Sequence, residues 1–308
     1  MTVKRKIAAV VGALMLGGVG AWGQAEAAKA GAGEVQATPA MWSVKGAHGT
    51  VYLFGTVHVM KPTVRWETEK EQAAFKASGT LYLEIADTGE AAMKAMQPLL
   101  LSMGMDTAHP LSTKISKEDV AALDVEMKKL GGAGESVVEP MQPWLVYLTL
   151  SMLPTVQAGY DPASGIDHVL QGEAKAAGKA IVGFETAEEQ LRILAGFPAA
   201  QQAVLLHEAL EELPKSVEKT NEMVEDWERG DVEKIAAMED GELKTKHPDL
   251  YEKLLVSRNE KMAATLGGLL KDPATGTVFV GVGAAHLAGP DSLQAMLAKQ
   301  GFVAVREQ

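Results

Sequence analysis

Residues 279–286 read FVGVGAAH, and residues 52–58 read YLFGTVH. In both stretches an apolar, β-rich run ends near a glycine, and a histidine, His58 or His286, follows three residues after that glycine. A strand delivers its last residues to one edge of a sheet, where α/β proteins bind ligands. One such histidine is more often a core or capping residue. Two such histidines in matching contexts, from opposite ends of the chain, predict that both side chains converge on one site.

Glu84 is the third candidate, because it places a carboxylate inside the otherwise apolar run 81–85. A charge in such a strand is costly unless it is paired or coordinates a metal. Two imidazoles and one carboxylate are ligand types of hydrolytic metal sites, in which a metal lowers the pKa of bound water. The alternative for Glu84 is a solvent-facing position on an edge strand.

Four further residues are weaker candidates. Asp167 opens a predicted helix and is most simply its N-cap. Glu185 ends a short strand, where it lines the same crevice or is solvated. Arg258 could clamp a carboxylate or an oxyanion with its forked guanidinium, although an arginine on a helix is more often in a surface ion pair. Asn259 follows it on the same helix.

The elements that surround these residues alternate between strands and helices. A hairpin is predicted from the runs 41–45 and 50–56 around Gly46–Gly49. Further strands are predicted at 80–85, 180–184, 277–282 and 302–305, and helices at 66–77, 116–130, 144–153, 166–177 and 290–299. The stretch 198–270 reads as helices alone. The expected fold is therefore α/β, a mixed central sheet flanked by helices, with a large helical insertion.

The composition excludes several classes of function. The chain has 308 residues, of which 47% are apolar and 22% charged, which is ordinary for a globular protein. Its net charge is −11 and no basic stripe offsets it, so nucleic acid is not expected as a partner. The absence of cysteine excludes thiol nucleophiles, zinc–thiolate sites and disulfides.

The first residues resemble an export signal. A basic segment, Lys4–Lys6, precedes the apolar run 7–21, and Ala25-Glu26-Ala27 fits a cleavage site, with the cut expected after Ala27. A membrane anchor is the alternative, but the run is short for a spanning helix. We expect a signal peptide at 1–27, a flexible leader at 28–40, one domain at 41–308, no remaining membrane span, and a periplasmic or secreted protein.

Taken together, the motifs resemble the TraB/GumN family, which includes the Tiki proteases. The matching segments lie in order along nearly the whole chain from Met41, and they are 52–59, 81–84, 165–167, 183–186 with Gln190, 258–259, and 279–287 with Gly289. One departure is that the family's acidic strand often reads Glu-Leu-Asp, whereas residues 84–87 read EIAD. A role for Asp87 is therefore in doubt.

The resemblance implies a fold related to the erythromycin-esterase and ChaN-like proteins. It implies an active site of His58, Glu84 and His286 that holds Mn²⁺ or Co²⁺ or activates its water, with Arg258 and Asn259 supporting or binding substrate. Asp167 and Glu185 are further candidates for substrate contact. The first hypothesis is an exported, metal-dependent hydrolase, with a peptide or a small molecule as substrate.

Two other hypotheses stay open. The first is a metal-free, esterase-like hydrolase in which one histidine is the general base and Glu84 orients it. The second is a non-enzymatic periplasmic module that binds a peptide, glycan or haem-like ligand, with the helical stretch 198–270 as its recognition surface.

Overall fold

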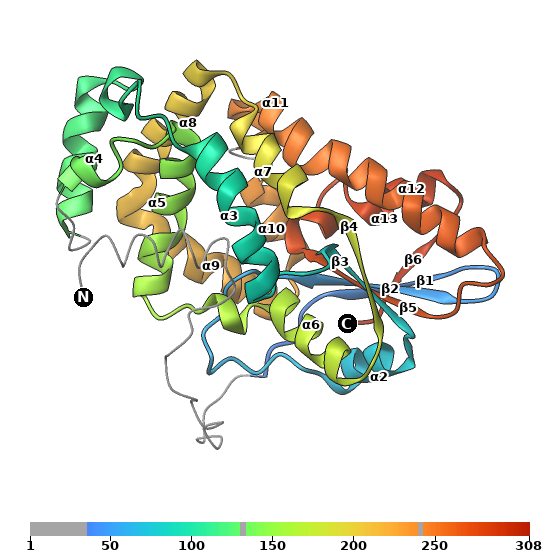
Figure 1. Ribbon diagram of the computed structural model, residues 1–308. Helices are drawn as coiled ribbons and strands as arrows, with labels where there is room; N and C mark the ends of the chain where they lie inside the picture. The colour runs from blue at the N-terminus through green and yellow to red at the C-terminus, as the bar shows by residue number, and fades with distance from the viewer. Residues whose placement is uncertain (1–35, 130–133, 240–242) are drawn as a thin grey trace. The chain divides into compact units, whose positions relative to one another are not determined.

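The computed structural model describes residues 36–129, 134–239 and 243–308 (Figure 1). The chain divides into two compact units, and each is built from separate stretches of chain. The sheet unit contains the described residues of 36–87, 163–186 and 221–308, and the helical unit contains those of 88–162 and 187–220. The expected signal peptide at 1–27 and most of the leader at 28–40 lie outside the described residues.

The end of the expected leader is packed rather than flexible. The backbone N–H of Ala37 donates to the carbonyl of Arg65, and that of Thr38 donates to the carbonyl of Glu228. Ala37 and Ala40 are both buried. Ordered structure thus begins before Met41, because small side chains let this stretch lie close against its neighbours.

Six strands form one mixed sheet, as the sequence predicts. They are β1 (Met41–Lys45), β2 (Thr50–Thr56), β3 (Thr80–Ile85), β4 (Ala180–Glu185), β5 (Val278–Gly283) and β6 (Ala304–Arg306). The order across the sheet is β4-β3-β5-β2-β1-β6. Strands β2, β5, β3 and β4 run parallel, whereas β1 is antiparallel to both its neighbours. The predicted hairpin of β1 and β2 is confirmed.

Successive side chains of β5 point to opposite faces of the sheet, and their contacts show which helices cover each face. Val278, Val280 and Val282 pack in one core with residues of α12 (Ser257–Lys271) and α13 (Leu293–Lys299). Phe279, on the opposite face, contacts Phe54 of β2 and Phe75 of α2 (Glu69–Ala77). Helix α6 (Ile166–Ala176) lies on that second face, and Figure 1 shows α2 and α6 on the side away from α12 and α13.

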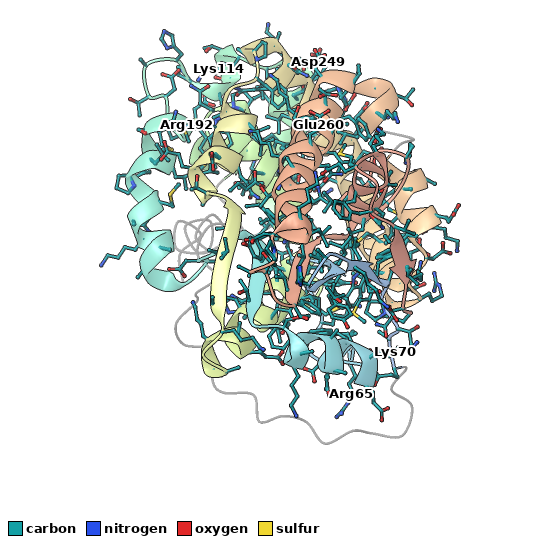
Figure 2. All side chains as sticks on the ribbon, turned by 90° about the vertical axis from the view of Figure 1, so that its right-hand side faces the viewer. Arg65, Lys70, Lys114, Arg192, Asp249 and Glu260 are labelled. Atoms are coloured by element: carbon teal, nitrogen blue, oxygen red, sulfur yellow. The ribbon has the colours of Figure 1, made fainter. Side chains whose placement is uncertain are left out.

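The remaining elements of the sheet unit precede α12 or join β5 to α13. They are the end of α9 (Ser216–Glu228), α10 (Val232–Glu239), α11 (Pro248–Tyr251), a π-helical turn (Glu252–Val256) and a 3₁₀ turn after β5 (Ala284–Leu287). Figure 2 shows charged side chains such as Lys70 on α2 and Glu260 on α12 at the surface of this unit.

The helical unit has a core of its own. Its main helices are α3 (Glu90–Gly104), α4 (Lys117–Lys129), α5 (Pro143–Gln157), α7 (Ala187–Ala195) and α8 (Ala199–Glu212). Trp144, Leu150 and Leu206 are fully buried in that core. Ser116 caps the start of α4, since its Oγ accepts from the backbone N–H of Asp119 at 3.0 Å.

The last two elements begin later than the sequence predicts. The last helix begins at Leu293 rather than at Pro290, because Ser292 caps it by accepting from the N–H of Ala295. Strand β6 covers residues 304–306 instead of 302–305, and it pairs with β1 at the edge of the sheet. No helix in the described ranges combines the length and the apolar character that crossing a membrane requires.

Candidate active site

The carboxyl ends of four parallel strands bring the candidate residues together within the sheet unit. His58 follows the end of β2 and His286 follows the end of β5, while Glu84 and Glu185 lie at the ends of β3 and β4. Because β5 lies between β2 and β3, the two histidines and Glu84 approach one another around Gly283. A Cβ on Gly283 would lie 3.1 Å from Glu84 Oε1, 3.7 Å from His286 Cδ2 and 3.9 Å from His58 Nε2.

Glu84 is not on an edge strand, since β3 lies between β4 and β5, and the residue is buried. Its Oε1 accepts a hydrogen bond of 2.7 Å from the backbone N–H of Gly283, and its Oε2 accepts one from Arg258. Burial by itself raises the pKa of a carboxyl. Here His286 in its protonated form, the charges of Arg258 and His58 and the Gly283 N–H outweigh burial and hold the pKa of Glu84 below its ordinary value. Glu84 is therefore a carboxylate.

His286 lies at the bottom of the cluster, with 4% of its side chain exposed. Its Nδ1 lies 2.6 Å from Oδ1 of Asn259, and its Nε2 lies 3.7 Å from Oε1 of Glu84. Burial lowers the pKa of His286 to about 4, against the opposing attraction of Glu84. The ring is therefore neutral near pH 7.

His58 is in a very different setting, because 62% of its side chain is exposed. Its Nδ1 lies 3.1 Å from Oδ2 of Asp167, in the first turn of α6. The charge of Asp167, together with its hydrogen bond, raises the pKa of His58 to about 9. Asp167 Oδ1 is buried and has no hydrogen-bond partner among the described residues. Asp167 thus holds a cationic His58 at the open side of the cluster.

Arg258 joins two of the strand-end carboxylates. Its guanidinium donates to Oε2 of Glu84 and, through Nε at 2.8 Å, to Oε1 of Glu185. The three side chains are mostly buried, with exposures of 13%, 10% and 13% for Arg258, Glu84 and Glu185. Arg258 is therefore in a buried ion-pair network and not in a surface pair.

Two residues named from the sequence lie apart from this cluster or behind it. Asp87 is an exposed residue 3.5 Å from Lys175. Asn259 is fully buried behind His286, so its burial disfavours the predicted contact with substrate. Sequence reasoning did not single out the Gly283 N–H as the anchor of Glu84. The only signal for it was a glycine at the end of a strand.

The donor set does not match a three-ligand metal site as it stands. Among the described residues, no group of three His, Asp or Glu side chains is placed to hold one metal ion. Glu84 Oε1 and His286 Nε2 face each other, but the second oxygen of Glu84 is bound to Arg258, whose positive charge opposes a divalent cation. The residues would have to move before His58, Glu84 and His286 could share a metal.

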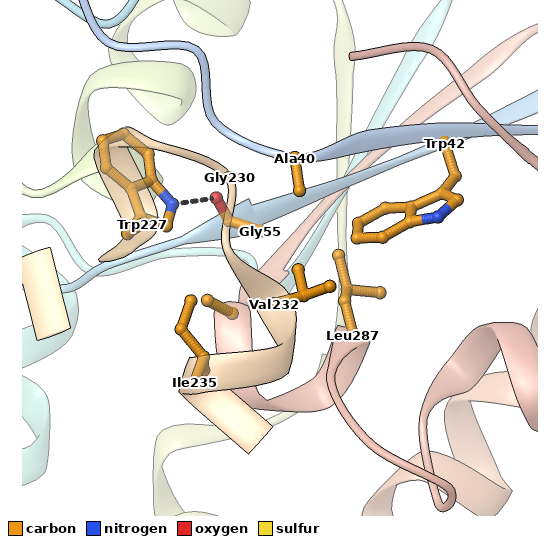
Figure 3. Close-up of a pocket in the computed structure, with 9 residues that line it drawn as sticks. Ala40, Trp42, Gly55, Trp227, Gly230, Val232, Ile235 and Leu287 are labelled. Atoms are coloured by element: carbon orange, nitrogen blue, oxygen red, sulfur yellow. Dashed lines mark hydrogen bonds between the residues drawn. The ribbon is translucent and has the colours of Figure 1, made fainter. Parts of the chain in front are cut away.

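A small pocket in the same unit does not belong to the cluster. It is lined by apolar side chains and glycines, and Figure 3 shows Trp227 donating its indole N–H to the carbonyl of Gly55 beside it. None of the ionisable residues of the cluster lines this pocket. Gly55 and Ala284 border this pocket. The strand ends that position the two histidines therefore have an apolar environment on the side that faces the pocket.

Comparison with known protein families identifies one family. The model of the TraB/PrgY/gumN family matches residues 40–306. The chain belongs to the TraB/PrgY/gumN family. The match covers the sheet and every residue of the cluster, so the TraB/PrgY/gumN assignment applies to the whole described fold. Searches of curated proteins and of solved structures gave no match.

Proposed function

We propose that this TraB/PrgY/gumN protein is a hydrolase in which His286 activates a water molecule for attack on a carbonyl carbon. One observation carries the proposal: His286 Nε2 and Glu84 Oε1 are 3.7 Å apart beside Gly283, which has no side chain to press on them. Two acceptors at this separation suit one water molecule that donates to both. A side chain on residue 283 would fill that space.

The opposite pKa shifts of the two histidines support a division of roles. His286, with a pKa lowered to about 4, is a base near pH 7, and His58, with a pKa raised to about 9, is a cation. Titratable groups whose surroundings move their pKa values apart are typical of acid–base catalysis.

The chemistry follows from these roles. His286 Nε2 removes a proton from water while the water oxygen bonds to the carbonyl carbon. Glu84 accepts the second hydrogen of the water and orients it. The carbonyl oxygen becomes an oxyanion, which His58 stabilises by donating a hydrogen bond. When the intermediate collapses, the bond to the leaving nitrogen or oxygen breaks, and His286 returns its proton to the leaving group. The products are a carboxylic acid and an amine or alcohol.

Hydrolysis of chromogenic peptide amides and esters by the purified chain tests the proposal. We expect His286→Ala and His58→Ala each to lower kcat/KM at least 100-fold, within the range of general acid–base and oxyanion contributions. His109→Ala is the matched control, since that histidine is exposed in the helical unit. Absence of turnover by the wild type, or full activity of His286→Ala, would contradict the proposal.

A metal-dependent hydrolase with a His58, Glu84 and His286 site is the second candidate, and a peptide bond is its expected target. The same facing pair of acceptors, Glu84 Oε1 and His286 Nε2, favours it, because both would be ligands of Mn²⁺ or Co²⁺. Metal analysis of the wild type and Glu84→Ala separates the two candidates. Bound metal that is lost in the variant, with turnover that a chelator abolishes, supports the metal. Turnover in the presence of chelator excludes it.

We also propose that the protein is exported, on the basis of the basic and apolar segments of residues 4–27. Cell fractionation followed by sequencing of the mature amino terminus tests this. A periplasmic or secreted protein that starts at Ala28 is the expected result, and a cytoplasmic chain that keeps Met1 would contradict it.

A further inference from the structure

Asn259 lies directly behind the ring of His286 and is closed off from solvent. It is in the first turn of α12, with 0% of the residue exposed, whereas the next residue, Glu260, is at the surface (Figure 2). A buried amide has to satisfy its donors and its acceptor within the protein. The partners of Asn259 therefore show which way its amide points.

The two donors of Asn259 identify the orientation of its amide. Its Nδ2 lies 2.8 Å from the carbonyl oxygen of Asp291 and 3.3 Å from that of His286. Carbonyl oxygens only accept hydrogen bonds, so the NH₂ group has to face them. Turning the amide over would set its oxygen against two carbonyl oxygens. The oxygen Oδ1 is thereby directed at the imidazole of His286.

The amide orientation in turn determines where the ring carries its proton. Oδ1 of Asn259 lies 2.6 Å from Nδ1 of His286, and an amide oxygen only accepts. Nδ1 therefore has to be the N–H. A neutral imidazole has one ring proton, so Nε2, on the side of Glu84, keeps its lone pair.

We infer that Asn259 is a positioning residue that holds His286 as the Nδ1–H tautomer, with Nε2 free to take a proton from water. The inference rests on the proposed function for its catalytic meaning, but the tautomer is a property of the resting protein. It gives Asn259 a role through His286 and no contact with substrate.

The loop that carries Asp291 is itself held in place. Asp291 Oδ2 accepts from the hydroxyl of Tyr251 at 3.0 Å and from Lys244 at 3.1 Å. These contacts involve the side chain of Asp291, whereas Asn259 binds its backbone carbonyl. Tyr251→Phe removes one contact of the Asp291 side chain and none of the hydrogen bonds that Asn259 makes, so it is a matched control.

Nitrogen NMR of the full chain with ¹⁵N-labelled histidine tests the inference. In the wild type, we expect His286 to give a protonated Nδ1 and an unprotonated Nε2. In Asn259→Leu, which keeps similar volume but has no acceptor, we expect this preference to be lost. We also expect kcat to fall about 10- to 100-fold, with KM changed less than threefold and the acid limb of the pH profile moved. Tyr251→Phe should match the wild type.

The outcomes separate the inference from the proposed function. A wild-type His286 protonated at Nε2, or an Asn259→Leu chain with an unchanged tautomer and pH profile, overturns the inference. The wild-type spectrum decides the tautomer even if Asn259→Leu fails to fold. A wild type with the expected tautomer but no hydrolytic activity supports the inference and contradicts the proposed function.

Discussion

The backbone N–H of Gly283 donates a 2.7 Å hydrogen bond to Oε1 of Glu84, so the last residue of β5 anchors a carboxylate on the neighbouring strand β3. The same glycine leaves open the space that Glu84, His58 and His286 border. One residue thus has two roles. Its N–H fixes an anion, and the absence of a side chain keeps a methyl group away from Glu84, His286 and His58.

Gly283→Ala should therefore slow turnover without unfolding the protein. The added methyl carbon would lie 3.1 Å from Glu84 Oε1 and occupy the space of the attacking water. The φ of −47° at Gly283 is one that alanine adopts readily. We expect kcat/KM to fall by about 10-fold or more, and the free energy of unfolding to fall by about 1 kcal/mol. Gly79→Ala, whose Cβ would meet nothing within 4 Å, should leave both unchanged. An active Gly283→Ala enzyme would refute this account of the open space.

Arg258→Met should destabilise the fold far more than loss of a surface arginine. It leaves the buried carboxylates of Glu84 and Glu185 without their cation, and breaking a buried pair costs about 3–5 kcal/mol. Arg192→Met is the control, because its partner Glu188 and the guanidinium are 46% and 58% exposed, and it should cost less than about 1 kcal/mol. Urea unfolding measures both. Equal losses in the two variants would mean that the Arg258 network does not stabilise the fold.

Asp167→Asn should move the pH dependence of the reaction. The Asp167 carboxylate stabilises the charged form of His58 and raises the pKa of His58 to about 9, so the wild type should lose activity as pH rises through that value. Removing the carboxylate should return the pKa toward 6.5 and shift the alkaline limb to lower pH. NMR titration of His58 and the pH profile of kcat/KM should move together. A profile that stays in place while the pKa falls would remove His58 from the chemistry.

Glu71→Gln should stabilise the protein in alkaline solution. Glu71 of α2 is buried, and its Oε2 has no hydrogen-bond partner among the described residues. Burial raises the pKa of Glu71 to about 8, with further contributions from Glu173 and Glu67. The folded state thus holds this proton while an unfolded glutamate releases it near 4.5, so stability falls as pH rises from about 4.5 to about 8.

Glutamine has no proton to release in this range, so the free energy of unfolding of the variant should not fall between pH 5 and pH 8. The variant should therefore gain roughly 1–3 kcal/mol on the wild type over that range. Thermal unfolding from pH 5 to pH 9 measures it. Glu69→Gln, on the exposed side of the same helix, is the control and should follow the wild type. Parallel curves for the wild type and Glu71→Gln would show that Glu71 is ionised in the fold.

Local patterns in the sequence predicted most of the strands and the place of the histidines. The hairpin of β1 and β2 and the strand 80–85 have the predicted limits, because alternation and turn residues act over a few positions. The approach of His58, Glu84 and His286 followed from matched Gly-x-x-His segments at parallel strand ends. Those signals are contained within short stretches of chain.

Long-range pairing was not predictable in the same way. Nothing near β5 specifies that it inserts between β2 and β3, and nothing near β6 specifies pairing with β1. The bridge from Arg258 to Glu84 and Glu185 also depends on how α12 packs on the sheet, because its partners lie 174 and 73 positions away. The role of Asn259 could be inferred only from the direction in which its amide points. That direction is set by hydrogen bonds to residues distant in the sequence.

The central place of β5 has a consequence for how the chain folds. Strands β2 and β3, which border β5, leave the ribosome long before it, since Gly283 follows its partner Glu84 by 199 positions. Until residues 278–283 emerge, β2 and β3 each lack the strand that pairs with them in the folded sheet. The β1–β2 and β3–β4 pairs can therefore be joined into one sheet only after residues 278–283 have been made, and contacts this distant in sequence favour slow folding. The helical unit, whose last described residue in this division is Thr220, is complete in sequence while the sheet still lacks its middle strand.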